Sequence, residues 1–209
     1  MKRFTATFVL AAAACFTVFI SCKEKDEIET MLSGFMTGYT DSEGYISVLN
    51  DDLGNQYMIS GETEKFTPDT LLRMVVVIAL EENNSARILQ KVYPFAYKAP
   101  EDSVIEDSLR IKDPVQIESV YIGGGFLNLS LGVKVQKEGT KHKIGYTHLD
   151  TPGKLSFTIY HNAYGDGQVY TKHAYLSIPL AGYGLGKNDT VFLSCKGYQE
   201  DYDYKLIYR

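Results

Sequence analysis

The carboxy-terminal half of this chain contains side chains that could carry out acid–base, nucleophilic or metal chemistry. His161 and Asp166 flank a tight turn, and His173 lies on the strand expected to follow it, so the three could form a cluster. His161 and Asp166 would make a hydrolytic triad with Ser177 or Cys195 as the nucleophile. However, no segment resembles a nucleophile elbow, so we expect no catalytic set.

Metal and phosphate binding are disfavoured by the spacing of the same residue types. The four histidines show no HxH or HExxH spacing, whereas zinc needs three or four converging ligands; they are His142, His148, His161 and His173. The glycines at 123–125 lead into a strand pattern rather than a helix, which favours a turn or bulge over a phosphate loop. We therefore expect no metal, no cofactor and no enzyme activity.

The amino terminus predicts covalent attachment of lipid at Cys22. Lys2 and Arg3 precede an apolar run that ends in Phe19-Ile20-Ser21-Cys22. A basic start, an apolar stretch and a small residue form a secretory signal, and the cysteine makes the end look like a bacterial lipobox. The alternative is an uncleaved transmembrane anchor, but the run is near the lower limit of about 17 residues for a span. We predict cleavage after residue 21.

A charged run follows the expected lipid site. Lys23, Glu24, Lys25, Asp26 and Glu27 resemble the export tag that Bacteroides-type bacteria place behind the lipid cysteine of surface lipoproteins. A solvated tether is the alternative interpretation. Under either interpretation, the lipid on Cys22 is expected to attach the protein to a membrane. The expected location is the outer membrane, facing the surface or the periplasm.

Composition narrows the class of partner. The 209 residues contain 26 acidic and 21 basic side chains, and the loss of Lys2 and Arg3 with the signal makes the mature chain more acidic still. No basic block supplies the footprint of a nucleic-acid-binding protein. Cys195 would be the one remaining unmodified cysteine, so no internal disulfide is expected. Its face of the run 190–195 predicts a buried thiol rather than a nucleophile.

The patterning predicts an all-β chain with two domains. We expect a signal peptide at 1–21, a tether at 22–32, an OB-like barrel at 33–98, a linker at 99–112 and an antiparallel β-sandwich at 113–209. Five β-prone runs separated by turn residues suggest the barrel, with the fifth run at 87–98. About seven short alternating runs suggest the sandwich. A short helix is possible at 103–109.

Several segments resemble the NigD-like lipoproteins of Bacteroidetes. They are Asp113-Pro114-Val115, the run 121–124, Phe126-Leu127-Asn128, the run 161–166 and the Asp-Asp-x-Gly-Asn turn at 51–55. The resemblance covers nearly the whole mature chain and implies an OB-like domain, a β-sandwich and a lipid anchor. One departure is Tyr121, where tryptophan is expected in many relatives.

These observations favour a lipid-anchored, non-catalytic binding module with an envelope protein or glycan as its partner. The candidate ligand-facing residues are Tyr121, His161, Asp166 and His173. The family name implies one alternative, a bacteriocin-associated accessory or self-protection lipoprotein. An envelope hydrolase that uses His161, Asp166 or His173 is another alternative.

Overall fold

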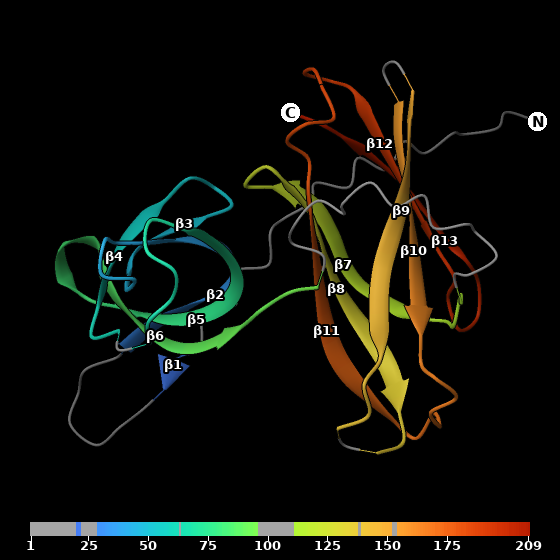
Figure 1. Ribbon diagram of the computed structural model, residues 1–209, viewed down its shortest axis with the longest axis horizontal. Helices are drawn as coiled ribbons and strands as arrows, with labels where there is room; N and C mark the ends of the chain where they lie inside the picture. Colours follow the sequence, from blue (N-terminus) through green and yellow to red (C-terminus); the bar gives the residue numbers. More distant parts are fainter. Residues whose placement is uncertain (1–19, 22–28, 63, 96–110, 138, 152–153) are drawn as a thin grey trace, which may run out of the picture.

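The chain folds into two β structures joined side by side, a barrel and a sandwich (Figure 1). The computed structural model describes residues 20–21, 29–62, 64–95, 111–137, 139–151 and 154–209. The expected lipid site, the charged run at 23–27 and the possible helix at 103–109 lie outside these residues. None of the described segments forms an apolar helix of the length that crosses a bilayer.

The amino-terminal half forms the expected closed barrel of five strands. The strands are β2 (Glu29–Thr40), β3 (Ile46–Asp51), β4 (Gln56–Ser60), β5 (Leu71–Leu80) and β6 (Ser85–Val92), with a 3₁₀ turn, η1 (Glu82–Asn84), before β6. They pair in the order β2-β3-β4-β6-β5, and β5 pairs again with β2 to close the ring. Only the β4–β6 pair of the ring is parallel. The prediction of an OB-like barrel is confirmed.

The barrel differs from the expectation at both ends. β2 already begins at Glu29, inside the segment expected to be tether, and β6 ends at Val92 rather than continuing to residue 98. After β6, Phe95 bridges Leu176 of the sandwich. A further short strand, β1 (Ile20–Ser21), pairs with the start of β2. Because β1 lies in the expected signal peptide, cleavage before Cys22 would remove it.

The carboxy-terminal half is the expected sandwich, built from seven strands among the described residues. One sheet contains β7 (Gln116–Gly123), β8 (Phe126–Val135) and β11 (Tyr170–Pro179). The other contains β9 (Lys143–Thr151), β10 (Lys154–Asn162), β12 (Thr190–Cys195) and β13 (Tyr202–Ile207). All neighbours are antiparallel except β10 and β12.

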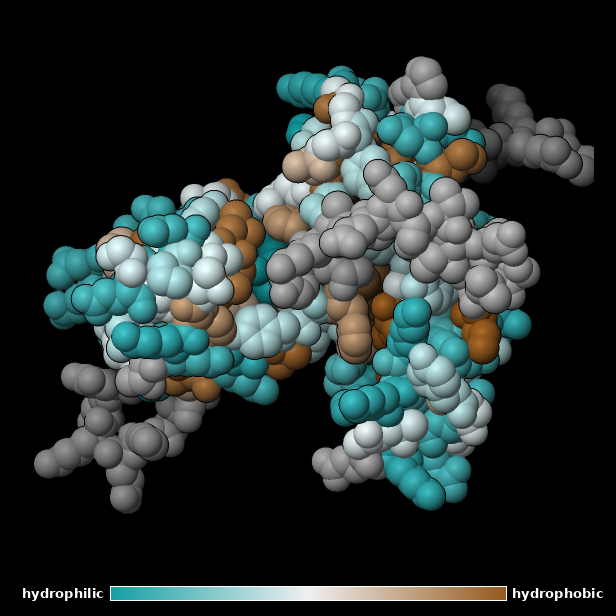
Figure 2. Space-filling view, in the orientation of Figure 1, coloured by the Kyte–Doolittle hydropathy of each residue, from teal (hydrophilic) through white to brown (hydrophobic). Residues whose placement is uncertain are grey.

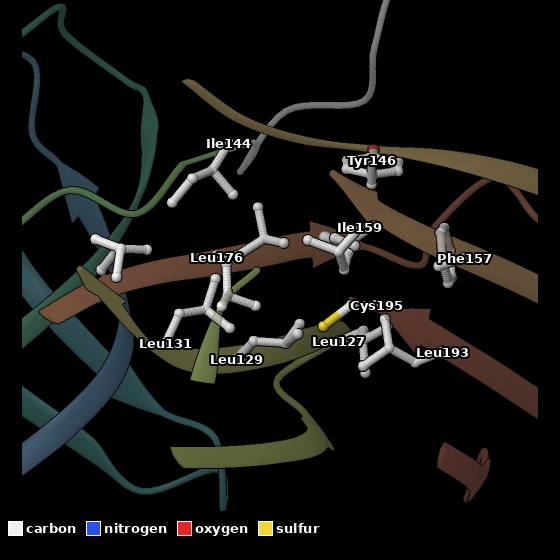
Figure 3. Close-up of a cluster of buried hydrophobic side chains, with 14 of the residues drawn as sticks. Leu127, Leu129, Leu131, Ile144, Tyr146, Phe157, Ile159, Leu176, Leu193 and Cys195 are labelled. Carbon is white, nitrogen blue, oxygen red and sulfur yellow. The ribbon is translucent and has the colours of Figure 1, made fainter. Parts of the chain in front are cut away.

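Alternate side chains along the strands point inward and form the sandwich core (Figure 3). Leu127, Leu129 and Leu131 of β8 are fully buried, as their spacing predicts. Leu193 and Cys195 of β12 reach the same core from the other sheet. Burial and the nearby charges of Asp201 and Asp203 raise the pKa of the Cys195 thiol to about 12. The prediction of a buried thiol is confirmed.

Strand β5 is apolar on both faces because one face packs in the barrel core and the other includes residues that lie against the sandwich. Its inward side chains, Met74, Val76 and Ile78, form the barrel core. Its outward face includes Arg73, whose side chain lies against the sandwich. In Figure 2, hydrophobic side chains gather on the barrel along the side that faces the sandwich. The barrel and the sandwich therefore share a contact surface.

Candidate functional site

A buried polar cluster joins the barrel to the sandwich and includes one of the predicted site residues, Tyr121. Its centre is Asp52, in the turn between β3 and β4. Asp52 Oδ2 accepts hydrogen bonds from Arg73 Nη2 at 2.7 Å, Tyr121 Oη at 2.8 Å and Asn128 Nδ2 at 3.0 Å. One carboxylate oxygen thus collects donors from β5, β7 and β8.

Arg73 completes the cluster from the barrel side. Its Nε donates to Ser177 Oγ at 3.1 Å, Nη1 to Thr37 Oγ1 at 3.1 Å, and Nη2 also to Asn128 Oδ1 at 2.9 Å. The Arg73 side chain is fully buried, and the centroid of the Phe126 ring lies 4.5 Å from its Cζ. A buried guanidinium needs a carboxylate and several acceptors, and this one has them. We call Thr37, Asp52, Arg73, Tyr121, Asn128 and Ser177 the interdomain cluster.

Burial and the Asp52 carboxylate raise the pKa of Tyr121, so its phenol remains a hydrogen-bond donor. Asp52 Oδ1, in contrast, is buried without a hydrogen-bond partner among the described residues. It lies against Gly124, where a Cβ would overlap it. Gly123 and Gly124 therefore allow the close approach of the barrel turn, in agreement with a hairpin turn rather than a phosphate loop.

A second polar group lies at the other end of the sandwich and contains His161 and Asp166. His142, at the approach to β9, connects them. Its Nε2 is 3.2 Å from Asp166 Oδ2, and its Nδ1 is 2.9 Å from His161 Nε2. His161 Nδ1 in turn faces the carbonyl oxygen of Pro114 at 3.3 Å. The row thus runs from a carboxylate through two imidazoles to a backbone carbonyl.

The two ends of this row can only accept hydrogen bonds, so the ring nitrogen that contacts each end must carry a proton to form one. A donor must face Asp166, another must face Pro114, and one proton must lie between His142 and His161. Three ring protons on two imidazoles satisfy all three contacts, so the pair then carries one positive charge. A fourth proton would place two donors against each other.

The surroundings of this row shift the pKa values of His161 and Asp166. Burial lowers the pKa of His161, and the neighbouring His142 lowers it further, against the opposing effect of the Pro114 carbonyl. Partial burial would raise the pKa of Asp166, but hydrogen bonds from the Gln136 amide and from His142 outweigh it, so the pKa is lowered. Asp166 is therefore an anion beside the histidine pair.

This row also holds the start of the sandwich in place. Asp113 N donates to His161 O at 2.9 Å, and Ala163 N donates to Asp113 Oδ2 at 2.8 Å. The segments 113–115 and 161–166, which are far apart in the sequence, are therefore packed together. In the same way, the turn at 51–55 meets the run 121–128 in the interdomain cluster.

The remaining candidate residues lie apart from these groups. His173 Nδ1 is 3.0 Å from the carboxylate of Glu118, on an exposed part of the sheet. Ser177 belongs to the interdomain cluster and Cys195 to the sandwich core, so neither is placed as a nucleophile for His161. Within the described ranges, no three histidine, cysteine or acidic side chains are arranged to hold a metal ion.

Sequence reasoning missed most of the interdomain cluster and the connecting role of His142. One feature could have indicated Arg73, because it is the one charged residue in the apolar run from Leu71 to Leu80. A lone charge in a buried strand requires a partner. Nothing in the sequence gives the identity of that partner, since Asp52, Asn128 and Ser177 lie on three other segments.

Comparison with known proteins places the sandwich in a described family. A family model for the NigD-like C-terminal beta sandwich domain matches residues 98–208. No curated protein matches the chain.

Solved structures resemble nearly the whole chain. A NigD-like immunity protein from Bacteroides caccae has 23% identity and a TM-score of 0.71, with 85% of this chain and 97% of that chain covered. A protein from Parabacteroides distasonis classed as toxin-related has 20% identity and a TM-score of 0.69, covering 86% and 93%. A protein from Bacteroides fragilis proposed to be a lipoprotein has 12% identity and a TM-score of 0.60, covering 86% and 98%. At these identities the likeness shows the fold.

Proposed function

We propose that this chain, which belongs to the NigD-like family, is a lipid-anchored protein of the cell envelope that acts by binding a partner. The observation that carries the proposal is the sequence Phe19-Ile20-Ser21-Cys22 behind a basic and apolar start. One similar structure is of a protein proposed to be a lipoprotein, which supports the same location. Several acyl chains on one cysteine would give stable attachment to a bilayer.

The arrangement of the candidate residues supports binding over catalysis. The row of Asp166, His142 and His161 ends on the Pro114 carbonyl rather than on a nucleophile. The other buried polar group is occupied by contacts between the barrel and the sandwich. Both groups serve to hold segments of the chain in place.

Metabolic labelling with palmitate tests the anchor. Wild-type protein and a Cys15→Ala variant are expected to incorporate label, because Cys15 lies within the signal. A Cys22→Ala variant is expected to lose the label and to retain its signal peptide. Equal labelling of Cys22→Ala and Cys15→Ala would contradict the proposal.

A second candidate function is self-protection against a toxin, and the names of two similar structures favour it. One is a NigD-like immunity protein and another is classed as toxin-related. A strain that lacks this protein would then be more sensitive to the bacteriocins of neighbouring strains. Wild-type protein should restore resistance, whereas Cys22→Ala should not. Unchanged sensitivity of the deletion strain to every bacteriocin tested would count against this function.

The charged run behind Cys22 supports display at the cell surface. Replacing residues 23–27 by serine and glycine is expected to leave palmitate labelling intact and to reduce digestion of the protein by protease added to whole cells. If the replaced and wild-type proteins were digested equally, the run would be a tether without an export role.

A further inference from the structure

The side chains on the outward faces of β2 and β5 change from buried to exposed with distance from the sandwich. Thr37 pairs with Arg73, and both are buried in the interdomain cluster. The next outward pair is Tyr39 and Leu71, which are exposed by 42% and 47%. The contact surface with the sandwich thus continues into an apolar surface that the described part of the chain leaves uncovered.

This apolar surface extends across four strands. Tyr39 of β2 pairs with Val48 of β3, and Val48 pairs with Met58 of β4. Residues that pair across neighbouring strands point to the same side of a sheet. Met58 is 52% exposed, so the side chains form a continuous outer row. We call Leu71, Tyr39, Val48 and Met58 the apolar row.

Acidic side chains border the row on the side away from the sandwich. Asp69 lies two residues before Leu71, and its N–H donates to the carbonyl oxygen of Asp41 at 3.2 Å. Asp69 and Glu43 are both exposed. The nearby cation of Lys65 lies over the Tyr45 ring, with Nζ 4.7 Å from the ring centroid. The border is therefore net negative.

We propose that the apolar row is the docking surface for a polypeptide segment that presents apolar side chains next to lysine or arginine. The proposal rests on the proposed function as a binding module and names its contact surface and partner chemistry. The apolar row is continuous with the buried contact between the barrel and the sandwich. A bound segment would therefore bury further apolar side chains next to that contact. The acidic border would attract its basic residues and slow its dissociation.

Other occupants fit the same surface less well. A second copy of this chain is net acidic and would bring like charges together at the border. A glycan site needs several polar groups that bond hydroxyls, whereas Tyr39 is the one residue of the row with a polar side-chain group. A nucleic acid is repelled by Asp69 and Glu43.

The test uses the full-length lipoprotein extracted in detergent and a fluorescent peptide of leucine and lysine, about 14 residues and so about four helical turns long. Wild-type protein is expected to bind it saturably below about 100 µM. A Tyr39→Thr/Leu71→Thr variant keeps β-prone residues in both strands and should weaken binding by about tenfold or more. A peptide with glutamate in place of lysine should not bind.

Two further variants make the test specific. Leu149→Thr/Ile207→Thr removes exposed apolar side chains from the sandwich and should leave the affinity unchanged. Asp69→Asn/Glu43→Gln removes charge from the border and should weaken binding about threefold while flattening its salt dependence. Asparagine suits position 69 because Asp69 has a φ of 51°.

Several results would overturn the proposal. They are no binding by wild-type protein, equal losses in the barrel and sandwich variants, or a wild-type dimer that Tyr39→Thr/Leu71→Thr converts to a monomer. Failure of the anchor is a separate outcome, because Cys22→Ala would lose palmitate and still bind the peptide. Conversely, a labelled, anchored protein whose peptide binding ignores the row variants would refute this surface alone.

Discussion

Asp52 and Arg73 form a buried ion pair, and its burial decides its contribution to stability. The Arg73 side chain is fully buried and that of Asp52 is 9% exposed. Removing one partner of such a pair leaves an uncompensated charge, which costs about 3–5 kcal/mol. Asp52→Ala should therefore lower the free energy of unfolding by about that amount, as measured by urea denaturation.

A surface ion pair supplies the control for this prediction. Arg87 and Glu29 are 2.7 Å apart, but their side chains are 48% and 39% exposed. Such pairs contribute about 1 kcal/mol or less. Glu29→Ala should therefore change the urea midpoint only slightly. Equal losses in Asp52→Ala and Glu29→Ala would show that the interdomain cluster does not hold a desolvated charge.

The histidine pair predicts how stability depends on pH. Burial holds the pKa of His161 below that of an unfolded histidine, so the unfolded chain binds this proton more readily. The stability that His161 contributes is present above about pH 6.5, the unfolded value, and falls as the pH drops below it. Unfolding by urea at several pH values should show this loss in wild-type protein.

His161→Gln removes the titrating ring while keeping a polar side chain at the position. In this variant the fall in stability between about pH 7 and pH 5 should be smaller than in wild-type protein. His173→Gln is the matched control, because His173 is exposed and pairs with Glu118 on the sheet surface. If His161→Gln and wild-type protein lost stability in parallel, the buried ring would not be the group responsible.

At the scale of elements, the β7–β8 hairpin shows how a turn shapes the contact between the barrel and the sandwich. Gly124 and Gly125 both have positive φ, 61° and 84°, as a tight hairpin turn requires. A Cβ on Gly124 would overlap Asp52 Oδ1, whereas a Cβ on Gly125 would meet open space. The two positions therefore share backbone strain and differ only in the contact with the barrel.

Alanine at each position separates these two effects. Gly125→Ala should cost about 1 kcal/mol of backbone strain. Gly124→Ala should cost about 1–3 kcal/mol more, because the turn of the barrel must move away. Thermal or urea unfolding of both variants measures the difference. Equal destabilisation would mean that Asp52 moves aside at no cost.

Strands were predictable from the sequence where apolar residues alternate along a single segment. Leu127, Leu129 and Leu131 alternate with other residues, and their burial follows from that alternation alone. The parallel pairings of β4 with β6 and of β10 with β12 join segments that no local pattern relates. The strands could therefore be read from the sequence, whereas the partner of each strand could not.

The same limit applies to the candidate site. Asp52 meets Asn128 across 76 residues, and His142 meets His161 across 19. Residue types indicate that a buried arginine needs an acceptor, but only the fold selects which one. The segments that resemble NigD-like lipoproteins gave an indirect indication of the site, because two of them, the turn at 51–55 and the run 121–128, are in contact.

At the scale of the whole molecule, the barrel and the sandwich are linked by more than the connecting chain. Phe35 of the barrel packs edge-on against Tyr121 and Tyr175, with ring centroids 6.2 and 5.8 Å apart. Phe95 exchanges backbone hydrogen bonds with Tyr175 and Ser177 of β11, at 2.8 and 3.2 Å. Separating the two halves would expose these rings and the charge of Arg73. We therefore expect the two halves to unfold together.

The absence of tryptophan from the chain makes this expectation measurable. Phe66→Trp places a fluorescent reporter in the barrel, and Tyr183→Trp places one in the sandwich, both at partly buried positions. In the otherwise wild-type chain the two reporters should give the same urea midpoint, as a cooperative transition requires. Adding Asp52→Ala should separate the midpoints, because each half would then unfold with its own stability. Two separate midpoints before that change would mean that the interdomain cluster does not couple the halves.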